Sequence, residues 1–207
     1  MKKDLILSLT LFAIFLLSSV GFAGDWDNTL AAATLNGKLY TVELDGALYE
    51  TDLPSGKWKQ LGKADFAKTK FMFASSADLV TLENDGSLYR VNPADGSWKQ
   101  IGKSGDWSKT MVGAMIGNKL YTVEREGALY ETNTANGTWR QLGKADFVRT
   151  KFLYATSDRL YSIEQIGSLF SIDPANGSWQ QIGSSNDWGN TNRSTMHNGK
   201  LYSTEGG

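Results

Sequence analysis

A block of about forty residues occurs four times in this chain of 207 residues, and the first half of the block occurs a fifth time. Its first anchor is the motif Asp-aromatic-x-x-Thr, which begins at Asp25, Asp65, Asp106, Asp146 and Asp187. Its second anchor is a five-residue segment such as Leu-Tyr-Thr-Val-Glu, which ends at Glu43, Glu83, Glu124, Glu164 and Glu205. Because successive motifs are 40 or 41 residues apart, each block is expected to form the same structural unit.

Within each block the hydrophobic pattern has a period of two, and turn residues interrupt it every eight to twelve positions. This pattern is typical of short β-strands. In the first block we predict strands over residues 30–35, 38–44, 47–52 and 58–61. The dipeptides Asn36-Gly37 and Asp45-Gly46 favour two-residue hairpin turns, which need positive φ angles. Consecutive strands are therefore expected to pair as antiparallel neighbours.

A four-stranded unit of this size that is apolar on both faces must be covered by copies of itself. We therefore predict an all-β fold, a β-propeller with blades at about 24–64, 65–104, 105–145 and 146–185 and a partial blade at 186–207. The first strand of a blade lies nearest the axis. It is small in odd blades, as at Ala31–Ala33, and bulky in even ones, as at Phe71–Phe73, which predicts that large side chains pack against small ones.

The fifth copy stops after its second predicted strand, at Glu205-Gly206-Gly207. Three interpretations stay open. The sequence is a fragment of a longer propeller, or a five-bladed ring contains one half blade, or two chains self-associate through the incomplete last blade. We favour the fragment.

Residues 1–23 combine Lys2 and Lys3 with an apolar run and a small-residue ending, which predicts a secretory signal peptide. The alternative is an uncleaved membrane anchor. We expect cleavage, no membrane insertion of the mature chain, and a secreted or periplasmic location. The formal net charge of −1 becomes −2 once Lys2, Lys3 and Asp4 are removed, so nucleic acid is not an expected partner. The chain contains no cysteine, so neither disulfides nor thiolate chemistry are available.

The segments 88–98 and 169–179 share the pattern Leu-[Tyr/Phe]-x-x-[Asn/Asp]-Pro-Ala-[Asn/Asp]-Gly-Ser-Trp, and Asn-Gly-Lys-Leu-Tyr occurs at 36–40 and 198–202. These segments resemble the kelch repeat. The repeat here is shorter, however, and Glu43 and its equivalents stand near the place of the kelch Gly-Gly pair. The short blades and Asp-Trp loops look more like the tachylectin and tectonin lectin propellers. Either resemblance implies binding of sugars or proteins and no chemistry.

In a propeller the loop before the first strand and the hairpin between the second and third strands lie on one face. That face would present an Asp, an aromatic ring and a Glu from each blade, a combination suited to a sugar. The candidate ligand-binding residues are Asp25, Trp26, Glu43, Asp65, Phe66, Glu83, Asp106, Trp107, Glu124, Asp146, Phe147, Glu164, Asp187 and Trp188.

The alternative for these residues is a repeated packing role, in which the aromatic residue is a wedge between blades, the Asp caps its own loop and the Glu is a solvated strand end. The outer-strand tryptophans are expected to be structural and to cover the blade edges: Trp58, Trp98, Trp139 and Trp179.

Catalysis has little support in the sequence. His197 is the sole histidine, and the acids recur in every blade, whereas a catalytic pair needs two different environments. No acid cluster has the spacing of a calcium loop, and no cofactor or metal is expected. The sequence therefore predicts a secreted, non-catalytic binding module for a glycan or protein ligand. A carbohydrate-binding, lectin-like role through repeated inter-blade sites is preferred, and a kelch-like protein-protein scaffold is the alternative.

Overall fold

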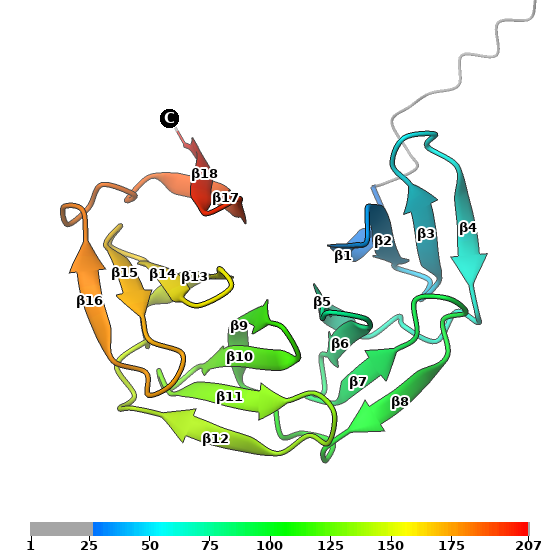
Figure 1. Ribbon diagram of the computed structural model, residues 1–207, viewed down its shortest axis with the longest axis horizontal. Helices are drawn as coiled ribbons and strands as arrows, with labels where there is room; N and C mark the ends of the chain where they lie inside the picture. Colours follow the sequence, from blue (N-terminus) through cyan, green and yellow to red (C-terminus); the bar gives the residue numbers. More distant parts are fainter. Residues whose placement is uncertain (1–26, 207) are drawn as a thin grey trace, which may run out of the picture.

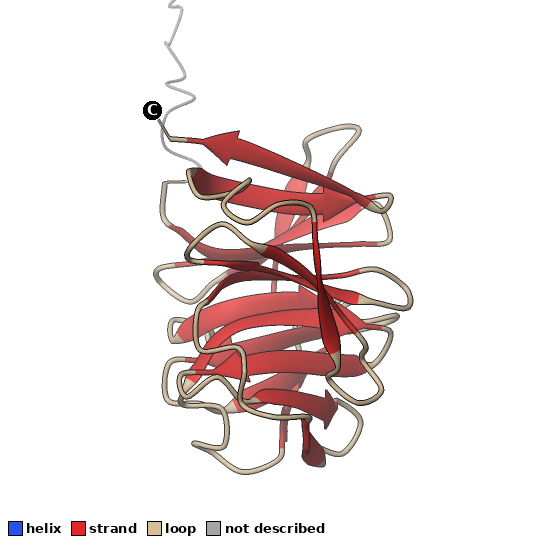
Figure 2. Ribbon diagram, turned by 90° about the vertical axis from the view of Figure 1, so that its left-hand side faces the viewer, coloured by secondary structure: helices blue, strands red, loops and turns tan. Residues whose placement is uncertain are grey.

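The computed structural model of the chain describes residues 27–206. This part contains eighteen strands and no helix, and the strands form four four-stranded antiparallel sheets and one two-stranded sheet (Figures 1 and 2). The signal peptide predicted at 1–23 and two candidate site residues, Asp25 and Trp26, lie outside the described residues.

Each forty-residue block corresponds to one sheet whose strands follow one another in order, so the predicted blade is confirmed. The strands of the first two blades are β1 (Thr29–Leu35), β2 (Lys38–Glu43), β3 (Leu48–Asp52), β4 (Trp58–Leu61), β5 (Thr69–Ala74), β6 (Leu79–Glu83), β7 (Leu88–Val91) and β8 (Trp98–Ile101). Those of the third and fourth blades are β9 (Thr110–Ile116), β10 (Lys119–Glu124), β11 (Leu129–Asn133), β12 (Trp139–Leu142), β13 (Thr150–Ala155), β14 (Leu160–Glu164), β15 (Leu169–Ile172) and β16 (Trp179–Ile182). The half blade consists of β17 (Thr191–His197) and β18 (Lys200–Glu205).

The blades are arranged as an open arc, a propeller-like array of four blades and a half (Figure 1). The first strands β1, β5, β9, β13 and β17 line the inside of the arc, and the fourth strands β4, β8, β12 and β16 lie on its outside (Figure 1). The order of the strands in each blade therefore runs from the axis outward.

The two kinds of hairpin differ from each other. Asn36 and Gly37 have φ angles of 51° and 75°, so this pair forms the predicted two-residue turn between β1 and β2. At Asp45-Gly46 only Gly46 has a positive φ, and the turn is wider. The backbone N–H of Glu43 donates to the carbonyl of Ala47, and the backbone N–H of Ala47 donates to the carboxylate of Asp45. The prediction of a two-residue turn at Asp45-Gly46 was wrong, because three residues, 44–46, separate the bonded pair Glu43 and Ala47 and only the last of them needs a positive φ.

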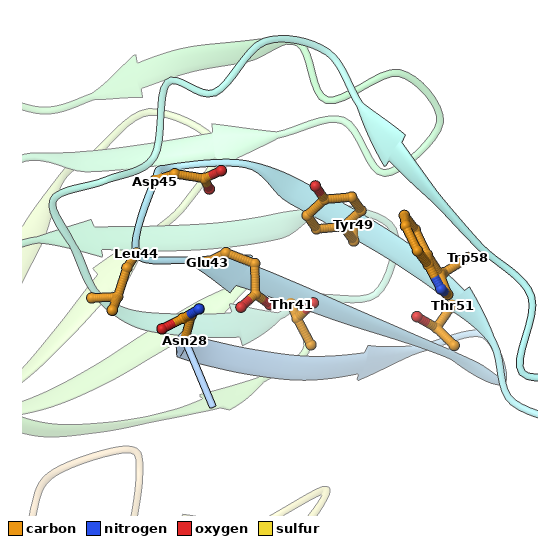
Figure 3. A pocket seen from close by; sticks show the side chains of 8 residues that line it. All are labelled: Asn28, Thr41, Glu43, Leu44, Asp45, Tyr49, Thr51 and Trp58. Atoms are coloured by element: carbon orange, nitrogen blue, oxygen red, sulfur yellow. The ribbon is translucent and has the colours of Figure 1, made fainter. Parts of the chain in front are cut away.

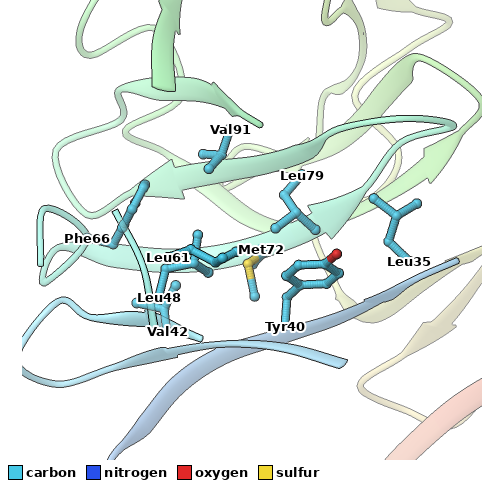
Figure 4. Close-up of a cluster of buried hydrophobic side chains, with 9 residues drawn as sticks. All are labelled: Leu35, Tyr40, Val42, Leu48, Leu61, Phe66, Met72, Leu79 and Val91. Carbon is cyan, nitrogen blue, oxygen red and sulfur yellow. The ribbon is translucent and has the colours of Figure 1, made fainter. Parts of the chain in front are cut away.

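Neighbouring blades share a buried apolar layer. Val42, Leu48 and Leu61 of the first blade pack in one cluster with Met72 and Leu79 of the second (Figure 4). Each of these five side chains is buried, and a fully buried side chain of this kind contributes roughly 1.5–3 kcal/mol. The same period-two pattern buries the other face of the second blade against the third blade. This explains why the middle strands are apolar on both faces.

The predicted packing of large against small inner strands is confirmed at Gly113. A Cβ placed on Gly113 in β9 would lie 2.7 Å from the ring of Phe73 in β5, so the Phe73 ring packs into the space that the missing side chain of Gly113 leaves.

The loop before a blade is bonded to the second hairpin of the preceding blade. The backbone N–H of Phe66 donates to the carbonyl of Gly46, at 3.0 Å, and Phe147 donates to Gly127 in the same way. The two loops predicted to share a face therefore do so.

Within residues 27–206 the structure contains no helix long and apolar enough to cross a membrane.

Candidate functional site

The second and third blades carry equivalent hollows on the face where these loops meet. The hollow of blade 2 has a volume of about 260 Å³, and that of blade 3 about 210 Å³. Each is lined by the loop before the first strand, the end of the second strand, the hairpin after it, an aromatic residue of the third strand and the outer tryptophan. In blade 2 the lining includes Asp65, Lys68, Glu83, Tyr89 and Trp98.

The outer tryptophan is held in place from two sides. In blade 2 the rings of Tyr89 and Trp98 meet edge to face, with centroids 5.1 Å apart. The indole N–H of Trp98 donates to the carboxylate of Asp65, at 3.1 Å. Although it is anchored in this way, Trp98 keeps 48% of its surface exposed. Its ring is therefore an oriented plate at the edge of the hollow.

This arrangement recurs along the chain. The indole N–H groups of Trp139 and Trp179 donate to Asp106 and Asp146, at 3.4 and 3.1 Å. In every complete blade the outer tryptophan meets a third-strand ring edge to face, with centroids 5.0 to 5.3 Å apart. The pairs are Tyr49–Trp58, Tyr89–Trp98, Tyr130–Trp139 and Phe170–Trp179. The predicted role of these tryptophans is to cover the blade edges; they lie on the fourth strands, and about half of each side chain is exposed.

A hollow of about 410 Å³ also lies on blade 1, lined by Thr41, Glu43, Tyr49, Thr51 and Trp58 among others (Figure 3). In Figure 3 the rings of Tyr49 and Trp58 lie at one end, Leu44 and Asn28 lie at the other, and Glu43 and Thr41 lie between them.

The glutamate that ends each second strand lies opposite the threonine that begins the first strand, and the two side chains are bonded. The Thr69 hydroxyl donates to Glu83 at 3.1 Å, Thr110 to Glu124 at 2.6 Å and Thr150 to Glu164 at 3.0 Å. The first and last copies repeat the bond between Thr29 and Glu43, at 2.9 Å, and between Thr191 and Glu205, at 2.8 Å.

Three of these carboxyl groups are buried. Glu83, Glu124 and Glu164 are each 7% exposed. Burial raises the pKa of Glu83 to about 7, because the nearby dipoles do not replace the lost hydration of the charged form. Burial also raises the pKa of Glu124 and of Glu164. For these three glutamates the alternative of a solvated strand end was wrong, whereas Glu43 is partly buried and Glu205 is exposed.

The rings of the predicted aromatic residues are buried between blades, although Phe66 and Trp107 also belong to the lining of their hollows. Phe66, Trp107 and Phe147 are each 3% exposed and pack in the layers between blades. The indole N–H of Trp107 donates to the hydroxyl of Thr132, at 3.2 Å, within that layer. Their rings thus have the geometry of the wedge role, and the exposed ring of each hollow comes instead from the fourth strand.

The predicted aspartates hold the tryptophans. Asp65, Asp106 and Asp146 accept from indole N–H groups instead of capping their own loops. Among the four of these aspartates that lie within residues 27–206, only Asp187 behaves as a loop cap, because it accepts the backbone N–H of Ser184 at 2.8 Å. Trp188, in the half blade, is partly buried against Gly183.

The exposed Trp and its third-strand partner are the site residues that we did not predict from the sequence. A usable signal existed, because an aromatic residue precedes each outer tryptophan by nine positions in all four blades. On antiparallel strands this spacing places the two rings diagonally on one face, as the pairing of Thr51 with Trp58 and of Tyr49 with Gln60 shows.

Replacing Asp65 with alanine is expected to free the indole N–H of Trp98, because its bond to the carboxylate is lost. We expect the Trp98 indole proton to exchange faster with water in ¹H–¹⁵N spectra. The free energy of unfolding should fall by less than about 1 kcal/mol, since the bond is exposed. Asp95→Ala is the matched control: Asp95 is an exposed carboxylate of the same blade that bonds to Ser97 and not to Trp98. Equal exchange in both variants would contradict the anchoring role of Asp65.

No protein-family model and no curated protein matches the chain. Among solved structures, the chain is similar to the computationally designed Ika8 protein, with a TM-score of 0.59 and 14% sequence identity. The match covers 86% of this chain and 55% of the designed chain, so this chain spans about half the length of that protein. At this identity the likeness concerns the fold alone.

Proposed function

We propose that the chain is a non-catalytic, multivalent carbohydrate-binding module with one weak site on the loop face of each blade. The supporting observation is the half-exposed tryptophan that recurs in all four blades, oriented by a second ring. The face of an indole ring suits the apolar face of a sugar. The carboxylates and the lysine or arginine around it can bond to sugar hydroxyls. Several weak sites on one rigid array gain strength through avidity.

The third-strand ring beside each tryptophan, and the aspartate bonded to it in blades 2, 3 and 4, also reduce the entropic cost of binding. A ring that is already held by an edge-to-face contact and an indole hydrogen bond loses little freedom when a ligand stacks on it. An exposed tryptophan without such anchoring would have to be ordered by its ligand.

The proposal is tested with Trp98→Ala, Trp139→Ala and Trp179→Ala, singly and together. A glycan array on the well-folded chain identifies a ligand, and titration with a polysaccharide then measures affinity. We expect each single variant to weaken binding severalfold and the triple variant to weaken it more than tenfold, because avidity is lost. Leu53→Ala is the control, since Leu53 is an equally exposed apolar side chain in the turn at the other end of the blade.

Absence of binding to any glycan by a chain that unfolds cooperatively would reject the carbohydrate proposal. Unchanged binding in the triple variant would reject the tryptophan sites.

A protein-binding scaffold is the second candidate, and the exposed apolar residues on the same face favour it. Leu44, Val148 and Ile166 are each more than half exposed, and they differ between blades. A scaffold would use these unequal residues. Alanine substitutions at the three positions would then weaken a protein partner more than the tryptophan substitutions do.

A further inference from the structure

The site of the fourth blade differs in charge from those of the second and third. In each of these three blades the loop before the first strand contains a basic residue, and the hairpin between the second and third strands lies next to that loop. The basic residues are Lys68, Lys109 and Arg149, and the hairpin residues at the equivalent position are Asp85, Glu126 and Ile166.

The backbone brings these two positions together in the same way each time. The hairpin N–H of Asn84 donates to the Lys68 carbonyl at 2.8 Å, and Arg125 donates to the Lys109 carbonyl at 3.0 Å. In blade 4 the N–H of Gln165 donates to the Arg149 carbonyl at 2.8 Å. Since the frame is shared, the difference between the sites lies in the side chains.

In blade 3 the cation is neutralised within the site. The Lys109 ammonium lies 2.7 Å from the Glu126 carboxylate, and both side chains line the hollow. In blade 2 Lys68 and Asp85 line one hollow together. No ion pair joins Lys68 to Asp85 among the described residues, but at either site a ligand meets a cation and a hairpin carboxylate in the same hollow.

In blade 4 the hairpin carboxylate is absent, because Ile166 takes its place with 52% of its surface exposed. Within residues 27–206 Arg149 makes no ion pair. Two carboxyl groups remain in the site, and both are engaged: Asp146 accepts from Trp179, and Glu164 is buried and accepts from Thr150. Arg149 is exposed and occupies the position from which Lys68 and Lys109 line the hollows of blades 2 and 3. By this equivalence its guanidinium is the charge that a ligand would meet here.

The aromatic plate is retained in the fourth blade. The rings of Phe170 and Trp179 meet at 5.0 Å and 85°, and Trp179 is half exposed. Phe170 replaces the tyrosine of the other blades, so this site is both less acidic and more apolar.

We propose that the fourth-blade site is selective for an acidic sugar, whose carboxylate pairs with Arg149 while its ring stacks on Trp179. The second- and third-blade sites take neutral sugars. This inference rests on the proposed carbohydrate-binding function and assigns a ligand class to one of its sites. A guanidinium can bond to a carboxylate through two N–H groups, which distinguishes the acid from the corresponding hydroxymethyl sugar.

The test uses methyl β-D-glucuronide and methyl β-D-glucoside, which differ only in carboxylate against hydroxymethyl. Each is titrated into the full chain at low salt while the indole ¹H–¹⁵N signals are followed, with assignment by Trp→Phe variants. At Trp179 we expect the glucuronide to bind about tenfold more tightly than the glucoside. At Trp98 and Trp139 we expect no preference for the acid. Added salt should reduce the preference at Trp179, because the pair is exposed.

Two single substitutions, one in blade 4 and one in blade 3, test whether the hairpin residue decides the preference for the acid. Ile166→Glu copies the Lys109–Glu126 arrangement into blade 4 and should abolish the tenfold preference at Trp179. Glu126→Ile removes the partner of Lys109 and should create a preference for the glucuronide at Trp139. Both positions are exposed, so neither change disturbs the core.

The outcomes separate the two proposals. Equal binding of both sugars at Trp179, or a preference that persists in Ile166→Glu, overturns the acid-selective site. Binding of the glucoside at Trp98 and Trp139 with no glucuronide response at Trp179 overturns the acid-selective site but leaves the carbohydrate proposal standing. No response of any indole signal to either sugar, with no glycan bound on the array, overturns both.

Discussion

Replacing Gly86 with alanine is expected to lower the free energy of unfolding by about 2–5 kcal/mol. Gly86 lies in the second hairpin of blade 2 with a φ of +81°, a conformation that costs an L-residue about 1–2 kcal/mol. A Cβ at this position would also lie 2.3 Å from the backbone nitrogen of Ser108, in the loop that leads to blade 3. Backbone cannot yield as a side chain can, so overpacking adds roughly 1–3 kcal/mol.

The expected damage concerns the contact between two blades. The carbonyl of Gly86 accepts the N–H of Trp107, at 3.2 Å, and Trp107 fills the layer between blades 2 and 3. Separating the hairpin from the loop to admit a methyl group weakens both interactions.

Gly37→Ala is the matched control for this substitution. Gly37 has a similar φ of +75°, but a Cβ there would meet nothing within 4 Å. It therefore carries the backbone strain of about 1–2 kcal/mol without the clash. Urea unfolding of the two variants measures the difference. Equal destabilisation would mean that the blades do not approach each other closely at Gly86.

Replacing Glu83 with glutamine is expected to make the stability of the chain less dependent on pH. The folded pKa of Glu83 is raised to about 7 from an ordinary 4.5, so the folded state favours the protonated acid. The contribution of Glu83 is fully present below about pH 4.5 and is lost as the pH rises through 7. One pKa unit corresponds to about 1.36 kcal/mol, so Glu83 costs about 3 kcal/mol between pH 4 and pH 8.

Glutamine keeps the size of the side chain and an oxygen that can accept from Thr69, but it does not ionise. The wild-type chain should therefore lose about 3 kcal/mol more than Glu83→Gln between pH 4 and pH 8. Denaturant unfolding at several pH values measures this difference. The raised pKa values of Glu124 and Glu164 act in the same direction in both proteins and cancel in the comparison.

Glu126→Gln is the control, because its carboxylate is exposed and its bond to Lys109 lowers the pKa. A lowered pKa contributes stability that is lost as the pH falls, so this variant should show a small difference of the opposite sign. Parallel pH profiles for the wild type and Glu83→Gln would contradict a buried, protonated Glu83.

The glutamate of the threonine–glutamate pair and the outer tryptophan of the same blade have different roles at the hollow. Glu83 and Glu124 both line their hollows and are buried at the end of the second strand. The Asp–Trp bond and the edge-to-face rings then orient the exposed ring above them. Blades 2, 3 and 4 thus each combine a buried, structural acid with an exposed aromatic plate.

Local pattern was sufficient to predict the blades. Alternation of side chains and the turn dipeptides act over a few residues, so the strands predicted for the first block agree with β1 to β4 to within one residue at each end. The sequence also predicted that first strands with small residues pack against first strands with large residues, and the contact of Phe73 with Gly113 confirms this prediction.

The tertiary structure decided which aromatic residue of each blade is buried and which is exposed. Phe66 and Trp98 are both aromatic and recur equally well, so the sequence did not distinguish their roles. Phe66 is enclosed because two blades meet around it, whereas Trp98 lies on the outer strand and is oriented by Asp65, 33 residues away. The sequence by itself determined the repeat, the strands and the all-β class, because these follow from local periodicity and turn chemistry. Only the tertiary structure assigned the wedge, the anchored plate and the buried acid, because burial and pairing depend on contacts between distant segments.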